Sequence, residues 1–466
     1  MKNNMIYDVK DKVPFWKNLL FALQQFLAII AATILVPKLV DGSGVYLSQS
    51  AALIGAGIGT IVYLLFTQFK SPVFLGSSFA YITPLITAVS FGYLGIVLGA
   101  LFAGLVYVII AIIIKFVGSN WINKLMPPII IGPVVALIGF DLAPSAISNL
   151  MNTSAGSYNL VAILVGIITF FVVILVSVKG GKTLKIFPFI VGILCGYILA
   201  TILTLIGMWT SCEVLQIVDF SPFEKIADFS NWLPNLTFVG MFREGAENIT
   251  SFGDILTLFV AFAPIALVSF AEHIADHKNL SSIINKDLLQ DPGLHRTLLG
   301  DGVGSIAGAF FGGCPNTTYG ESIGCVALSK NASTRTIFTA SIMCVVIAFF
   351  YPMIAFVESI PDCVIGGICI ALYGFISVSG LRMFKEVDLN DSKNLFVVAS
   401  VFICGIGGLI LEFGSVKISN IACALIVGII ANLILNIKNK KEEKTEISSN
   451  SELLENKKTI KQKKSK

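Results

Sequence analysis

The sequence predicts an all-α membrane protein that crosses the bilayer many times. Hydrophobic residues make up 55% of the 466 residues and charged residues only 13%, about half of the ~25% that soluble domains carry. Apolar stretches of about 20 residues, the length that spans ~30 Å of hydrocarbon, recur along almost the whole chain. Two of these stretches are interrupted by helix-breaking and small polar residues at matching places in the two halves, which is typical of a transporter built from repeats.

Fourteen candidate spans follow from the apolar stretches and the turn-forming residues between them. The first seven are predicted at 15–39, 47–67, 72–89, 92–115, 126–143, 158–178 and 184–208. The other seven are predicted at 255–276, 297–313, 315–329, 334–355, 361–380, 394–412 and 417–437. The remaining segments are a polar N-terminus (1–14), a loop over 209–254 that we expect outside the cell, and a charged tail over 438–466.

The distribution of basic residues supports this count. If the fourteen spans are right, only Lys38, Lys225, Arg243 and Lys417 of the 32 Lys and Arg residues lie on the outer side. Because basic residues favour the cytoplasmic side, both termini are predicted to be cytoplasmic in a multi-pass protein of the plasma membrane. A missed or extra span would place many of the basic residues that are assigned to the cytoplasmic side on the outer side. Each half has seven spans, and halves with an odd number insert with opposite orientation, so 15–208 and 255–437 are predicted to be inverted repeats.

The interrupted third and tenth spans are candidate parts of a binding site. Residues 312–322 stack Gly, Pro, small polar residues and the carboxylate of Glu321 between two apolar segments, and residues 71–80 are the counterpart in the first half. Irregular backbone at membrane depth has to line a protein cavity, because lipid cannot satisfy its N–H and C=O groups. A half-helix that starts after each interruption offers free N–H groups and a partial positive charge. The alternative is a structural kink without a ligand.

The end of span eight carries further ionisable residues. Glu272 and Asp276 are four residues apart, so they lie on one face of a helix, whereas His273 points about 100° away. A carboxylate in hydrocarbon costs about 2.5–3.5 kcal/mol, which makes Glu272 a candidate functional residue. Asp276, His277 and Lys278 can also be explained as the polar cytoplasmic end of the helix.

These groups favour a particular class of ligand. Two carboxylates, free backbone N–H groups and the aromatic residues Phe79, Tyr319 and Tyr373 suit a flat heterocycle with N–H donors and carbonyl acceptors. Two glutamates would repel an inorganic anion. The chain has no nucleophile–base pair, no P-loop and no metal-ligand spacing among its nine cysteines, so we expect neither an enzyme nor a cofactor or metal. The glycines of 55–59 lie within a span and indicate helix packing. The Lys- and Glu-rich tail indicates a solvated or lipid-facing segment and not a nucleic-acid site.

Three motifs carry further information, namely AEH at 271–273, KDLLQDPGLHR at 286–296 and PNTTYGE at 315–321, together with LGSSFA at 75–80 and YG at 373–374. In combination they resemble the uracil permease branch of the nucleobase–ascorbate transporter family. The resemblance covers roughly 15–437. It implies fourteen spans in two inverted repeats, with a core domain (spans 1–4 and 8–11) and a gate domain (spans 5–7 and 12–14). It also implies a short strand in each of spans three and ten, pairing near the substrate, and a homodimer.

The resemblance further implies the roles of individual residues. Glu272 and Glu321 would bind the N–H groups of a base. The backbone at Phe79 and Gly320 would meet its carbonyl edge, while Ala32, Tyr319 and Tyr373 would line the pocket. Glutamate at position 321 is typical of members that carry uracil and glutamine of many that carry purines. Family members couple uptake to protons, or in some branches to sodium, and Glu272, Asp276 and His273 are the candidates for proton coupling.

The chain also departs from the family pattern. Gln25 stands where members usually have histidine, Ser322, Ser329 and Lys330 replace signature residues, and Asp276 occupies a position where some uracil-type members have histidine. The predicted function is uptake of uracil with protons. A xanthine or purine permease of the same fold, and an anion exchanger or channel of a related fold, are the alternatives.

Overall fold

The computed structural model describes residues 5–42, 44–118, 121, 125–152, 157–181, 184–186, 188–413 and 416–436. The charged tail predicted at 438–466 lies outside the described residues. Helices dominate the fold, as predicted. Those of the first half are α1 (Phe15–Val40), α2 (Gln49–Phe66), α3 (Ile82–Val89), α4 (Gly92–Val117), α6 (Pro128–Met151), α7 (Leu160–Lys179) and α8 (Pro188–Thr210). Those of the second half are α11 (Phe252–Ile284), α12 (Leu294–Gly312), α13 (Gly320–Ser329), α14 (Thr334–Ile347), α15 (Tyr351–Glu358), α16 (Asp362–Arg382), α17 (Ser392–Ile406) and α18 (Asn420–Leu435).

The length and hydropathy of these helices confirm a multi-pass membrane protein. In the described part of the chain, eight helices are long and apolar enough to cross a bilayer, or nine if α14 and α15 form one broken span. The axes of those two helices differ by 82°. Predicted spans three and ten each contain a strand and a half-helix, and spans thirteen and fourteen correspond to the shorter helices α17 and α18. Span nine corresponds to α12, which has 19 residues. The predicted loop over 209–254 contains two short helices, α9 (Ser221–Glu224) and α10 (Thr237–Glu244), and a hairpin of β3 (Leu411–Phe413) and β4 (Val416–Ile418) joins α17 to α18.

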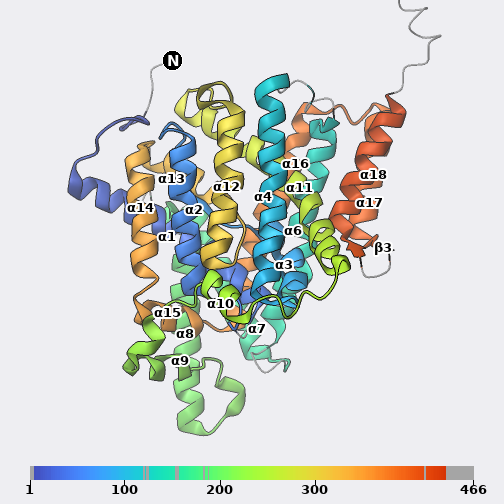
Figure 1. Cartoon of the computed structure of the whole chain (residues 1–466). Coiled ribbons are helices and arrows are strands. Elements are labelled where there is room, and N and C mark those ends of the chain that lie inside the picture. The colour runs from blue at the N-terminus through green and yellow to red at the C-terminus, as the bar shows by residue number, and fades with distance from the viewer. Residues whose placement is uncertain are drawn as a thin grey trace, which may run out of the picture.

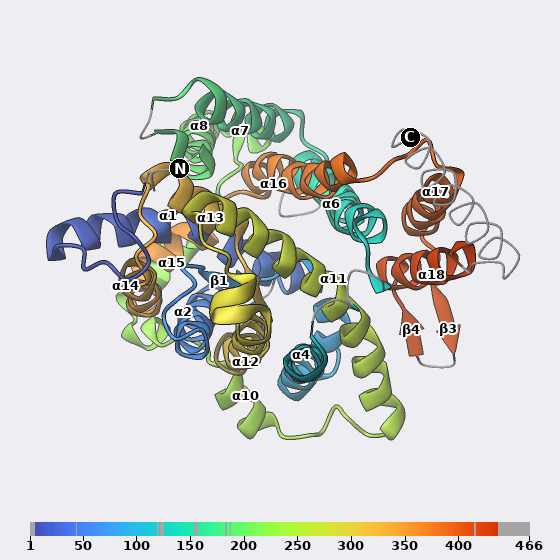
Figure 2. The same ribbon diagram turned by 90° about the horizontal axis from the view of Figure 1, so that it is seen from above.

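The helices gather into two bundles, which Figures 1 and 2 show from the side and from above. In the first bundle, α12 packs against α2 and α4, α14 packs against α1 and α2, and α11 packs against α4. In the second bundle, α16 packs against α6 and α7, α7 packs against α8, and α17 packs against α6 and α18. Each bundle therefore contains helices from both halves of the chain.

Two short strands lie at the centre of the first bundle. The strand β1 (Leu75–Ser77) pairs with β2 (Asn316–Thr318) in antiparallel register, with Gly76 opposite Thr317. The prediction that each interrupted span contains a strand and that the two strands pair is thus confirmed. The helix breakers leave backbone N–H and C=O groups without helical partners. The paired strands satisfy these groups with hydrogen bonds to each other.

Close packing of α2 against α12 brings this strand pair into place. A Cβ atom added to Gly55 would lie 2.4 Å from the carbonyl oxygen of Gly308, so the two backbones touch. Between them the Asn316 side chain donates from Nδ2 to the carbonyl of Gly55 (2.9 Å). The glycines of 55–59 are therefore packing residues, as the sequence indicates.

The N-terminal residues 5–11 form a strap on the first bundle. Their backbone bonds to the turn before α14, with Ala332 N–H donating to Tyr7 (2.9 Å) and Thr334 N–H to Val9 (3.1 Å). Lys286, after the end of α11, donates from Nζ to Asp8 Oδ2 (2.7 Å). The strap thus joins the segment after α11 to the segment before α14, and β2 lies between these two segments in the sequence.

We expect the strap to loosen in acid. Partial burial raises the pKa of Asp8, but hydrogen bonds from Lys286 and the Val9 N–H outweigh it and lower that pKa overall. A carboxyl group whose pKa is lowered by folding stabilises the fold above its unfolded pKa, ~3.9, and that contribution disappears as the pH falls through the lowered value. Amide hydrogen exchange of residues 5–11 should therefore be faster in Asp8→Asn than in the wild type at pH 7. Equal exchange rates at pH 7 would contradict this.

Candidate functional site

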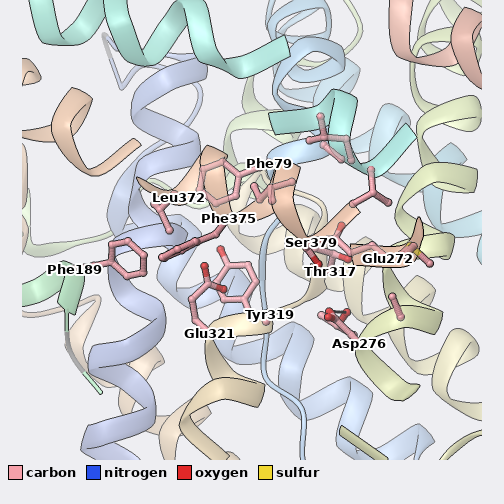
Figure 3. Close-up of a pocket in the computed structure, with 18 residues that line it drawn as sticks. Phe79, Phe189, Glu272, Asp276, Thr317, Tyr319, Glu321, Leu372, Phe375 and Ser379 are labelled. Carbon is pink, nitrogen blue, oxygen red and sulfur yellow. Dashed lines mark hydrogen bonds between the residues drawn. The ribbon is translucent and has the colours of Figure 1, made fainter. Parts of the chain in front are cut away.

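A cavity of about 350 Å³ lies between the two bundles, beside the strand pair. Its volume is in the range of small-molecule sites, ~300–1,000 Å³. The first bundle contributes Phe79, Ala80, Glu272, Ala275, Asp276, Thr317, Thr318, Tyr319, Gly320 and Glu321. The second bundle contributes Val135, Ile138, Phe189, Leu372, Phe375, Ile376 and Ser379, and Met383 follows α16. Figure 3 shows these side chains around the cavity.

Three carboxylates line the cavity. Glu272 and Asp276 come from successive turns of α11, and Glu321 comes from the first turn of α13. The hydroxyl of Thr318 on β2 donates to Asp276 Oδ2 (2.6 Å), which orients this carboxylate. The first turn of α13 places Glu321 beside unpaired N–H groups and a partial positive charge, which offset part of the cost of burying its carboxylate.

Tyr319 fixes the start of α13 against β1. Its backbone N–H donates to the carbonyl of Phe74 (3.1 Å), and its hydroxyl donates to the carbonyl of Ser77 (2.8 Å). The ring therefore lies across Gly76, where an added Cβ would be only 2.3 Å from Tyr319 Cζ. Only glycine leaves room for the ring at this place, so Gly76 helps to position Gly320 and Glu321.

Two aromatic pairs flank the cavity. Phe79, at the start of the half-helix in the first half, meets the ring of Tyr373 on α16 edge-on at 5.8 Å between centroids. Phe189 and Phe375 form a second edge-on pair at 6.2 Å, entirely within the second bundle. Tyr373 itself is buried behind the lining and Ala32 is buried in α1, so neither belongs to the lining.

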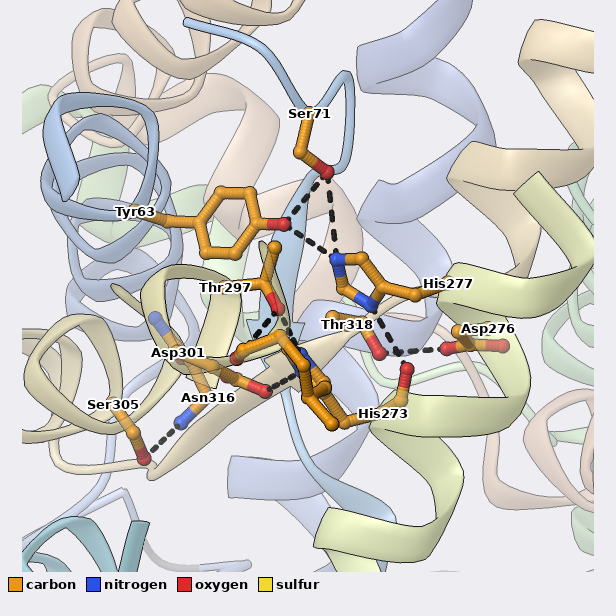
Figure 4. Close-up of polar contacts among 11 residues, drawn as sticks. Tyr63, Ser71, His273, Asp276, His277, Thr297, Asp301, Ser305, Asn316 and Thr318 are labelled. Carbon is orange, nitrogen blue, oxygen red and sulfur yellow. Dashed lines mark hydrogen bonds and ion pairs between the residues drawn. The ribbon is translucent and has the colours of Figure 1, made fainter. Parts of the chain in front are cut away.

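His273 lies away from the cavity, in a buried polar network that Figure 4 shows. Its Nδ1 is 2.7 Å from Asp301 Oδ2 and its Nε2 is 3.0 Å from the Thr297 hydroxyl. Thr297 uses its own hydrogen on the carbonyl of Leu294 (3.1 Å), so its oxygen has to accept from His273 Nε2–H. One proton is then shared between Nδ1 and Asp301. Whether that proton lies on the imidazole or on the carboxylate, the pair has no net charge.

His277 extends this network one turn further along α11. Its ring stacks on that of His273 with 4.0 Å between centroids. Its Nδ1 is 2.8 Å from the carbonyl of His273, so Nδ1 carries a hydrogen. Its Nε2 is 2.7 Å from the hydroxyl of Tyr63, which also bonds to Ser71 Oγ (2.7 Å). His277 is fully buried and is not part of a solvated helix end. The two rings therefore hold α11 in the rotation that points Glu272 and Asp276 into the cavity.

Several residues of this region were not predicted from the sequence. Asp301 could have been found, because an ionisable residue within a span is a functional candidate by default. Thr318 and Thr317 lie inside the PNTTYGE motif but were not singled out. The side chains of the second bundle, such as Phe189 and Phe375, carry no recognisable signal, because aromatic residues are common in membrane spans.

The electrostatics of the cavity favour donors and cations over anions. Among the described residues that line the cavity, three are carboxylates and none is Lys, Arg or His. A bound anion would find no positive side chain in this lining and would be repelled by any ionised carboxylate. A ligand with N–H donors, by contrast, finds acceptor oxygens on both α11 and α13.

The chain is similar to known permeases over almost its whole length. A model of the permease family matches residues 16–412. Uracil permease from Bacillus caldolyticus is 37% identical over 437 residues, which cover 93% of this chain and 95% of that protein. Uracil permease from Bacillus subtilis (strain 168) is 35% identical over 96% of this chain and 98% of its own length. That from Escherichia coli (strain K12) is 33% identical, with coverage of 92% and 94%.

Two solved structures share the fold at low sequence identity. The transmembrane domain of the cyanobacterium bicarbonate transporter BicA matches with a TM-score of 0.59 and 13% identity, covering 91% of this chain and 100% of that one. The structure of SLC26A9 matches with a TM-score of 0.60 and 11% identity, covering 90% of this chain and 64% of that one. At such identities the likeness concerns the fold alone.

Proposed function

The chain belongs to the permease family, and from this premise we propose that it is a transporter that imports uracil through the plasma membrane. The observation that carries the proposal is the convergence of Glu272 on α11 and Glu321 on α13 on one cavity. Relatives named as uracil permeases, similar over almost the whole chain, support the same substrate.

In the proposed complex, uracil lies between the two glutamates. Glu272 accepts a hydrogen bond from one ring N–H and Glu321 from the other. The free N–H groups at Phe79 and Gly320 donate to the carbonyl edge of the base. The Phe79 ring covers one face of the base, and Tyr319 keeps the half-helix that carries Glu321 in register with β1.

We further propose that a proton accompanies the base. Glu272 and Asp276 line the cavity one turn apart on α11, so one proton shared between them would remove the repulsion of two adjacent negative charges. His273 is a poor proton carrier, because its proton is already shared in the neutral pair with Asp301. A sodium ion held by Asp276 and Thr318 is the alternative for coupling.

The two bundles would act as the core and gate domains of an alternating-access transporter. Spans 1–4 and 8–11 supply the first bundle and spans 5–7 and 12–14 the second, in two inverted repeats of seven and with both termini cytoplasmic. Broken helices that meet at a central site are the usual form of such transporters. A homodimer is expected from the family resemblance.

Two other functions are weaker proposals. A xanthine or purine permease would have the same fold, but glutamate at position 321 favours uracil. An anion exchanger fits poorly because the described lining of the cavity contains carboxylates and no basic side chain.

Glu321→Gln should weaken uracil binding by about 10- to 100-fold, because a hydrogen bond to a charged group contributes ~1.5–3 kcal/mol. The measurement is equilibrium binding of labelled uracil to the purified protein, with excess xanthine as competitor. Glu224→Gln, on the exposed helix α9, is the matched control and should bind as the wild type does. Displacement of uracil by xanthine from the wild type would instead support the purine alternative.

A further inference from the structure

Lys38 and Asp362 connect the two bundles at one end of the molecule. Lys38 lies in the last turn of α1 and Asp362 in the first turn of α16. The Nζ atom of Lys38 donates to the carbonyl of Ile360 (2.8 Å) and is 3.6 Å from Asp362 Oδ1. Their side chains are only 21% and 30% exposed. In the described part of the chain, no other ion pair joins the two bundles.

The placement of both charges suits the helix ends that meet here. A cation in the last turn of a helix and an anion in the first turn each interact favourably with the helix dipole. Glu358, at the end of α15, adds a second negative charge that attracts Lys38. The ammonium group therefore binds a junction of helix ends and not a single carboxylate.

An apolar seal lies directly beside this ion pair. It encloses a void of only about 20 Å³. Both bundles line the void, through Ala31, Ile34, Leu35 and Lys38 of α1, Val357 and Ile360 at the end of α15, and Ile193, Ile365 and Ile368 of α8 and α16. Lys38 is the one polar residue of this lining, and a void of this size has room for about one water, so it is too small to form a hydrated path between the bundles.

The main cavity extends in the opposite direction. Its lining includes Phe189 in the first turn of α8 and Met383 just after α16. These are the ends predicted to face the cytoplasm, whereas Lys38 is among the four basic residues predicted outside. The structure thus combines a wide cavity toward one side with a closely packed, charged junction toward the other.

We propose that Lys38, with Asp362 and the Ile360 carbonyl, is an outer latch that keeps the bundles together while the cavity faces inward. The latch has to open before a base can enter from outside, which rests on the proposed function and orientation. Because both side chains keep some contact with solvent, hydration of the separated charges offsets part of the free-energy cost of breaking the ion pair. The latch can therefore stabilise the inward-facing state without locking it.

Cys363 is a native reporter of this movement. It follows Asp362 in the first turn of α16, is 1% exposed and lies within electrostatic reach of Lys38. With a membrane-impermeant maleimide added outside, Lys38→Met should label at Cys363 about tenfold faster than the wild type, a change of about 1.4 kcal/mol in favour of the open form. Lys38→Arg should keep the slow rate. Asp362→Asn should lie between them, because the carbonyl of Ile360 still binds Lys38.

Controls make the result specific. Cys363→Ser in the same background has to remove the fast signal, and melting temperatures near that of the wild type have to show that each variant is folded. Labelling of folded Lys38→Met at the wild-type rate, or faster labelling only from the inside, would overturn the latch. If Lys38→Met does not fold, Asp362→Asn decides in the same way. The assay needs no substrate, so faster labelling in a protein that does not bind uracil would keep the latch and refute the proposed substrate.

Discussion

Glu272→Gln is expected to abolish concentrative uptake of uracil. The substitution removes the charge that accepts a ring N–H in the proposed complex and also one of the two carboxylates that share the proposed proton. Loss of one charged hydrogen bond weakens binding by about 10- to 100-fold, and loss of the proton site removes the coupling as well. Residual transport should therefore run only down the uracil gradient and should not respond to pH. The measurement is the initial rate and final level of labelled uracil uptake into cells at pH 6 and pH 8.

Glu272→Asp is the conservative partner of this variant. It keeps the charge but withdraws it by one methylene, so uptake should be weakened and remain dependent on pH. Glu224→Gln serves as the neutral control in the exposed loop. Full accumulation by Glu272→Gln with the pH dependence of the wild type would remove the central residue of the proposed mechanism.

Gly76→Val is expected to abolish transport without unfolding the protein. A Cβ at this position would lie 2.3 Å from Tyr319 Cζ, and the ring is held at that place by its bond to the Ser77 carbonyl. Overpacking of this kind typically costs about 1–3 kcal/mol. The ring has to move, and Gly320 and Glu321, the next two residues along the chain, move with it. Uracil affinity should fall by at least about tenfold, as measured by equilibrium binding.

Gly324→Ala is the matched control for this experiment. Gly324 belongs to the same half-helix, but no atom lies within 4 Å of its added Cβ. Alanine also favours a helix by up to ~1 kcal/mol over glycine, so binding should be unchanged. Wild-type affinity in Gly76→Val would show that the contact between Tyr319 and β1 does not position the site.

The two interrupted spans and the carboxylates of the cavity could be predicted from the sequence because they break its dominant pattern, whereas the strand pair was expected only from the family resemblance. Gly, Pro and Asn within an apolar stretch cannot continue a membrane helix, so 71–80 and 312–322 stand out by composition alone. Glu272 and Glu321 stand out because charge is costly in hydrocarbon. The same signal was present for Asp301, whose burial against His273 was nevertheless not foreseen.

Other features of the site depend on contacts between helices, which the sequence pattern does not predict. The pattern of apolar and polar residues predicts that Glu272 and His273 face different directions, but not that His273 meets Asp301 on α12. From the sequence, His277 could equally be explained as part of a solvated helix end, whereas in the structure it packs against His273, Tyr63 and Ser71. The aromatic pairs depend on which helices become neighbours, and this information does not reside in any single span. The 82° bend between α14 and α15 and the hairpin between α17 and α18 likewise depend on three-dimensional context.

The most direct test of the proposed function is uptake of labelled uracil into proteoliposomes under an imposed proton gradient. Accumulation above the external concentration that collapses with an uncoupler, persists without sodium and is unaffected by excess xanthine is the predicted result. Uptake that ignores the proton gradient, or that xanthine blocks, would contradict a uracil transporter driven by protons.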